Sequence, residues 1–108
     1  MKRMTSLATV KVLLLSVFLI VGCSHKPHYV TLTWQPPQPV SGVTIVSYNI
    51  YRSTRQGGPY VLLATSISSL TYDDHIVNRG QTYFYIVRSV DQHGRESKDS
   101  MEVTAVIP

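Results

Sequence analysis

Gln81-Thr82-Tyr83-Phe84-Tyr85-Ile86-Val87-Arg88-Ser89-Val90 is the stretch that decides the fold of this chain. Most of its residues are aromatic or β-branched, and such residues favour a pleated strand. It is followed by Asp91-Gln92-His93-Gly94, a turn in which glycine adopts a positive φ without penalty. Side chains alternate between the two faces of a strand. We therefore predict one long strand with two unlike faces, Tyr83, Tyr85, Val87 and Ser89 on the inner one and Phe84, Ile86, Arg88 and Val90 on the outer one.

The same two-residue alternation of apolar and polar side chains continues through most of the chain after His28. It predicts further strands over residues 29–35, 45–52, 60–64, 70–72 and 101–107. Turn signals separate them: Pro36-Pro37 ends the first, and Gln56-Gly57-Gly58-Pro59 follows the second. Asp73-Asp74 breaks the pattern after the fourth, where we expect a turn. Because no stretch repeats at helical spacing for long, we predict an all-β chain whose short strands form a sandwich.

Three motifs within residues 29–107 resemble the fibronectin type III family and occur in that family's order. They are Val30-x-Leu32-x-Trp34 before Pro36-Pro37, Tyr48-x-Ile50-Tyr51-Arg52, and Gly80-x-x-Tyr83-x-x-x-Val87-x-Ser89-Val90, in which serine replaces the usual alanine. The resemblance implies an immunoglobulin-like β-sandwich with a central tryptophan and a tyrosine corner, in which the Tyr83 hydroxyl bonds backbone a few residues upstream. The core residues expected on this basis are Trp34, Tyr48, Ile50, Leu70, Tyr83 and Val87.

The N-terminal 22 residues have the three parts of an export signal. Basic Lys2 and Arg3 precede an apolar stretch over residues 12–21, and small Gly22 precedes Cys23. The uninterrupted apolar segment is about half of the ~20 residues that a membrane-spanning helix needs. Ile20-Val21-Gly22-Cys23 resembles a bacterial lipoprotein signal (lipobox), which implies cleavage between Gly22 and Cys23 and a diacylglycerol on the cysteine thiol.

These observations predict three parts of the chain. Residues 1–22 are the signal peptide, residues 23–28 are the lipidated cysteine with a short linker, and residues 29–108 are the fibronectin type III domain. Two or more acyl chains, at ~0.8 kcal/mol per buried CH₂, anchor a protein stably. We therefore expect a lipid-anchored protein of the bacterial cell envelope. Ser24 after the cysteine favours the outer membrane if the host is Gram-negative.

The short linker limits how much of the sandwich can precede the Tyr29 strand. Residues 24–28, at about 3.3 Å each, reach roughly 17 Å and must also clear the lipid headgroups. We therefore expect the first strand of the sandwich to be short or missing. The second strand would then have an open edge, and open edges invite pairing with another chain.

Charge and motifs exclude several classes of function. Loss of Lys2, Arg3 and Lys11 with the signal lowers the formal charge from +4 to +1, and the other basic residues are scattered, so nucleic-acid binding is not expected. Of the four histidines, His25 and His28 lie in the linker and His75 and His93 in two different loops. No pair has ligand spacing, so we expect neither a metal nor any cofactor beyond the covalent lipid. No nucleophile elbow or phosphate-binding glycine loop occurs, which predicts that the chain is not an enzyme.

The best candidate for a binding surface is the outer face of the sheet. It combines Asn49, Tyr51, Phe84, Ile86 and Arg88. Exposed apolar surface marks protein contacts, yet strand propensity alone also places such residues on either face. Two routes to a partner remain open, through this face or through the open strand edge. The partner that we expect is an envelope protein or a polysaccharide. A carbohydrate-binding accessory module is the alternative to a protein-binding or spacer module.

Overall fold

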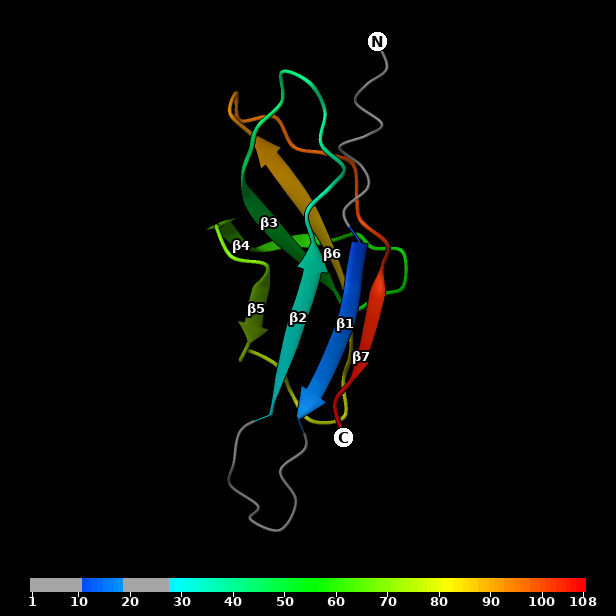
Figure 1. The fold of residues 1–108 in the computed structure, drawn as a ribbon. Coiled ribbons are helices and arrows are strands. Elements are labelled where there is room, and N and C mark those ends of the chain that lie inside the picture. Colours follow the sequence, from blue (N-terminus) through cyan, green and yellow to red (C-terminus); the bar gives the residue numbers. More distant parts are fainter. Residues whose placement is uncertain (1–10, 19–27) are drawn as a thin grey trace.

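Figure 1 shows a computed structural model of the chain, which describes residues 11–18 and 28–108. The described residues form seven strands and no helix. The strands are β1 (Lys11–Phe18), β2 (Tyr29–Gln35), β3 (Ile45–Ser53), β4 (Val61–Ile67), β5 (Thr71–Asp74), β6 (Thr82–Asp91) and β7 (Val103–Val106). All their pairings are antiparallel, in one sheet of order β1-β2-β5 and a second of order β4-β3-β6-β7. The prediction of an all-β sandwich is confirmed.

Strand β6 is the long strand predicted from residues 81–90, displaced by one residue at each end. It lies in the interior of its sheet between β3 and β7, and its side chains from Tyr83 to Ser89 alternate as predicted except at Ile86. Tyr83, Tyr85 and Val87 belong to the core, and Ser89 is buried beside them. The backbone N–H of Asn78 donates to the Tyr83 hydroxyl at 2.9 Å, which is the tyrosine corner that the resemblance implied.

The other strands lie where they were predicted, with three notable differences in their bounds. The last strand, expected over residues 101–107, is shorter and covers only Val103–Val106. Strand β4 extends three residues beyond the expected end, to Ile67, and bulges against β3. Strand β5 continues through Asp73 and Asp74, so the expectation of a turn at these residues is wrong. Both aspartates pair with β2, Asp73 opposite Thr31 and Asp74 opposite Val30, and this pairing keeps the backbone extended.

The expectation of a short or missing first strand was made for a chain cut before Cys23; the full chain, by contrast, has a first strand of eight residues. Residues 11–18, which the sequence assigned to the signal, form β1 along the edge of β2. A short apolar run is compatible with either a signal segment or a strand, and periodicity alone does not distinguish them. In the structure of the whole chain the β2 edge is therefore covered, and β1 lies between β2 and β7 (Figure 1).

The core lies between the two sheets and contains five of the six expected residues. Trp34, Tyr48, Ile50, Tyr83 and Val87 are all buried, and the Trp34 and Tyr48 rings meet edge to face with centroids 5.5 Å apart. Leu70 is the exception, because 41% of its surface is exposed. It lies just before β5, where its backbone carbonyl accepts a hydrogen bond from the backbone N–H of Trp34 at 3.1 Å. Its backbone rather than its side chain therefore stabilises the fold.

A buried carboxylate links the two sheets. Asp74, 1% exposed at the end of β5, accepts hydrogen bonds from the Tyr85 hydroxyl at 2.6 Å and from Arg52 Nη1 at 2.8 Å. Tyr85 and Arg52 belong to the opposite sheet, and the Arg52 guanidinium also lies 4.9 Å from the centre of the Tyr83 ring. Burial, and then the Asp74 carboxylate, raise the pKa of Tyr85. A buried charge of this kind needs several partners, and Asp74 has them.

Candidate functional site

The outer face of the four-stranded sheet brings the predicted binding residues together. Asn49 and Tyr51 lie on β3, directly opposite Arg88 and Ile86 of β6, and Phe84 is opposite Ser53. Four of the five candidates are partly buried, and Ile86 is only 1% exposed. The expectation that Ile86 is a solvent-facing contact residue is wrong, because only 1% of its surface is exposed at its position opposite Tyr51 in the interior of the sheet.

A glutamate that sequence analysis did not single out occupies the centre of this face. Glu96, from the connection between β6 and β7, accepts hydrogen bonds from Asn49 Nδ2 and from the Tyr51 hydroxyl, each at 2.5 Å. Its second oxygen accepts from Arg88 Nη1 at 3.0 Å. The guanidinium of Arg88 lies 4.3 Å from the centre of the Tyr51 ring and also donates to Asp99 at 2.8 Å. We call Asn49, Tyr51, Arg88 and Glu96 the Glu96 cluster.

The hydrogen-bonding groups of the Glu96 cluster are paired within the protein. Burial acts to raise the pKa of Glu96, but the hydrogen bonds from Tyr51, Asn49 and Arg88 outweigh it and lower this pKa. The pKa of Tyr51 is raised, by burial first and then by the neighbouring carboxylate. Asn49 completes its own set by accepting from the Thr65 hydroxyl at 2.8 Å. Because these charged groups are already paired with one another, few hydrogen-bonding groups on this face are left for a partner. This weakens the prediction that a partner binds to the outer face of the sheet.

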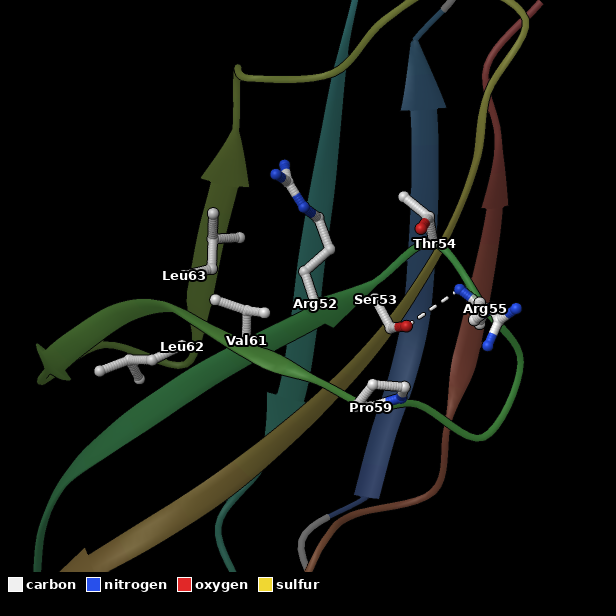
Figure 2. Close-up of a pocket in the computed structure, with 8 residues that line it drawn as sticks. All are labelled: Arg52, Ser53, Thr54, Arg55, Pro59, Val61, Leu62 and Leu63. Carbon is white, nitrogen blue, oxygen red and sulfur yellow. Dashed lines mark hydrogen bonds between the residues drawn. The ribbon is translucent and has the colours of Figure 1, made fainter.

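A shallow groove of about 320 Å³ lies beside the start of β4 (Figure 2). Its arginine at the end of β3, Arg52, is already engaged by Asp74 and by the carbonyl of Ile76, at 2.8 and 2.6 Å. Ser53 accepts a hydrogen bond from the backbone N–H of Arg55 at 2.9 Å. These polar groups do not converge on a common point. The lining residues are Arg52, Ser53, Thr54, Arg55, Pro59, Val61, Leu62 and Leu63.

The described part of the chain contains no group of three or more histidine, cysteine or acidic residues that could hold a metal ion. The His75 ring lies against Tyr29, with centroids 5.0 Å apart, and His93 is in the turn after β6. Within residues 11–18 and 28–108 there is likewise no helix long and apolar enough to cross a bilayer. The predicted lipidation and cleavage residues, Cys23 and Gly22, lie outside the described residues.

The second predicted route, the edge of β2, is occupied by the chain itself. β1 pairs with β2 in register from Lys11 opposite Gln35 to Phe18 opposite Tyr29, with one irregularity between Val12 and Leu14. On its other side β2 pairs with β5 over Val30 to Thr33. Every residue of β2 thus lies beside β1, and residues 11–18 also contact β7. The structure shows that this edge accepts a complete strand.

Two bacterial amylopullulanases are similar to this chain in sequence. The protein from Thermoanaerobacter thermohydrosulfuricus is 50% identical over 60 residues, which is 56% of this chain and 4% of that protein. The protein from Thermoanaerobacterium saccharolyticum is 36% identical over 76 residues, or 70% of this chain and 6% of the relative. The chain therefore spans only a small fraction of the length of these curated relatives. No family model matches the sequence.

Solved structures extend the similarity to whole domains. A Fn3-like protein from Clostridium thermocellum is 39% identical, with a TM-score of 0.64, and the match covers 74% of this chain and 77% of that protein. A solution structure of a human FNIII domain, described as the fourth, has a TM-score of 0.65 at 21% identity over 87% of this chain and 74% of that one. The first match is close enough in sequence and coverage to show common family, and the second shows the same fold.

Proposed function

Because the chain belongs to the fibronectin type III family, we propose that it is a non-catalytic module that a lipid on Cys23 holds in the bacterial cell envelope. Its role there is to bind an envelope partner or to act as a spacer. The observation that carries the proposal is the placement of the single cysteine. It follows an apolar run and small Gly22, where a lipoprotein signal would place it.

The side-chain chemistry of the domain supports a non-catalytic role. The carboxylates of Asp74 and Glu96 each accept hydrogen bonds from two or more side chains of the same domain. A general acid or base needs a shifted pKa together with access to a substrate, and the buried Asp74 has no such access. The amylopullulanases that match are enzymes, but the matching stretch is a minor part of their length. This pattern fits an accessory module.

Membrane fractionation tests the anchoring. The full chain is expressed in a bacterium with a lipoprotein pathway, beside a Cys23→Ser variant. We expect the wild-type domain to sediment with membranes and to enter the detergent phase of a Triton X-114 extraction. We expect the serine variant to be absent from the membrane pellet and from the detergent phase. Equal partitioning of the two proteins would contradict lipid anchoring. The chain would then still be a fibronectin type III module, but the proposed location in the envelope would be wrong.

A carbohydrate-binding accessory module is the second candidate, and the similarity to amylopullulanases favours it. Sugar binding by stacking requires exposed aromatic rings. The large apolar side chains exposed in the described part of the chain are all aliphatic: Val46, Val61, Leu62, Leu70, Ile76, Met101 and Val106. We therefore expect no retardation of the domain by soluble starch or pullulan in affinity electrophoresis. Clear retardation by either polymer would make this second candidate the better one.

A further inference from the structure

Residues 11–18 have two incompatible destinations. In the structure they are β1, paired along the whole of β2 and in contact with β7. In the proposed function they belong to the signal that is removed before Cys23. Cleavage would therefore remove a strand that pairs with β2 and contacts β7. This inference rests on the proposed function, because only a processed chain loses β1.

Loss of β1 would leave β2 with β5 as its only neighbour in the sheet. Backbone N–H and C=O groups that paired with β1 would become open, and such an edge is a template for another strand. Val30, Leu32 and Trp34 of β2 are at most 3% exposed in the full chain. Exposing part of this apolar surface to water would cost further free energy, and a new strand bound in the same place would bury that surface again.

We propose that the β2 edge, from Tyr29 to Gln35, is a binding site for an extended apolar strand of an envelope protein. That strand lies antiparallel to β2 and takes the position that residues 11–18 hold in the unprocessed chain. Main-chain hydrogen bonds to β2 supply part of the affinity, and apolar side chains that reach the core supply the rest.

The chemistry of the site defines the kind of strand that it accepts. β2 itself, Tyr-Val-Thr-Leu-Thr-Trp-Gln, carries no charged residue. The strand now seated there, Lys-Val-Leu-Leu-Leu-Ser-Val-Phe, has its one charge at its first residue, opposite Gln35. Neither strand offers a charge pattern for recognition. The ligand is therefore a segment of about seven apolar and small polar residues, and its binding depends little on salt.

The short linker to the lipid favours a different protein over a second copy of this chain. Two copies joined antiparallel through β2 would have their Tyr29 ends at opposite ends of a seven-residue strand, roughly 23 Å apart at about 3.3 Å per residue. Residues 24–28 reach only roughly 17 Å when fully extended. If the β2 strands lay perpendicular to the membrane, the linker of the copy whose Tyr29 is farther from the bilayer would be too short for its lipid to insert. A strand from a protein without this anchor has no such restriction.

Strand exchange in a nicked full chain tests the proposal. A protease site is inserted next to Gly22 in a Cys23→Ser background, the folded protein is cut, and a fluorescent peptide of residues 11–18 is added. We expect the peptide to replace the cut segment and to slow amide hydrogen exchange in residues 30–34 at least tenfold relative to the nicked chain washed free of its leader. The matched control peptide carries Leu15→Pro, which prevents continuous pairing with Leu32. We expect it neither to compete nor to protect.

Three results would overturn the proposal: equal binding of the two peptides, no change in exchange within residues 30–34, or a washed chain that forms a dimer protected at β2 without peptide. The last result would identify a second copy as the occupant. This experiment needs no lipid and no cellular processing, so its failure leaves the anchoring proposal intact. Conversely, equal membrane partitioning of wild type and Cys23→Ser would leave the measured strand exchange unchanged.

Discussion

The Asp74 carboxylate and the Tyr85 hydroxyl meet 2.6 Å apart between the two sheets, and this contact joins β5 to β6. Asp74 is 1% exposed and Tyr85 is fully buried. A hydrogen bond to a charged acceptor contributes about 1.5–3 kcal/mol. We expect Tyr85→Phe to lower the free energy of unfolding by about that amount, measured by urea denaturation. Asp73→Asn, at the exposed neighbour of Asp74, is the matched control and should change it by about 0.5 kcal/mol or less. Equal losses in the two variants would contradict the role assigned to Asp74.

Ile86 offers a second test, because it lies on the outer face of the sheet yet is 1% exposed. Large-to-small substitution of a buried isoleucine costs about 2–5 kcal/mol. We expect Ile86→Ala to lower the free energy of unfolding within that range. Val106→Ala on β7, where the side chain is 63% exposed, is the control and should have little effect. If the two variants are equally stable, the outer face is open at Ile86 and available to a partner.

The Glu96 cluster predicts a dependence of stability on pH. Glu96 has a pKa below its ordinary value of 4.5 in the folded protein, because the bonds from Tyr51, Asn49 and Arg88 outweigh its burial. A lowered carboxyl pKa stabilises the fold fully above the unfolded value, and that contribution is lost as the pH falls through the folded value. We expect the free energy of unfolding to fall between pH 7 and pH 3, and to fall less in Glu96→Gln. Identical pH profiles for the two proteins would show that the cluster does not favour the charged form of Glu96.

The two glycines of the turn between β3 and β4 should respond differently to substitution. Both have positive φ, at 80° for Gly57 and 94° for Gly58. A Cβ on Gly57 would meet nothing within 4 Å, whereas one on Gly58 would lie 3.0 Å from the Tyr60 ring and 3.2 Å from its backbone nitrogen. Alanine is strained at each site by about 1–3 kcal/mol. We expect Gly58→Ala to have a melting temperature clearly below that of Gly57→Ala. A reversed order would contradict the close packing of this turn on Tyr60.

Much of the fold could be predicted from single strands. The bounds of β6, the burial of Trp34 and the tyrosine corner at Tyr83 all follow from local alternation and from motifs that stay within one strand and its adjoining turn. The inside and outside of β3 followed equally well, with Tyr48 and Ile50 in the core. Alternation predicts which face a residue occupies. It does not predict what covers that face.

The features that sequence analysis missed depend on segments distant in the chain. Glu96 reaches Asn49 from 47 residues away, and Asp74 reaches Arg52 from 22 residues away. Ile86 was expected to be exposed because it alternates with core residues, but only 1% of its surface is exposed in the folded chain. Strand β1 was missed for another reason. An apolar run of this length is compatible with a signal segment as well as with a strand, and the strand is recognised only from its pairing with β2.

We propose that the chain is cut before Cys23 and lipidated there, and the first measurement to make is the intact mass of the protein purified from bacterial membranes. We expect a wild-type mass equal to residues 23–108 plus a diacylglycerol and an amide-linked acyl chain, and we expect Cys23→Ser to carry neither lipid. A wild-type protein that keeps residues 1–22 and has the mass of the unmodified chain would contradict the claim. Residues 11–18 would then remain the first strand of the sandwich, as β1 is in the structure.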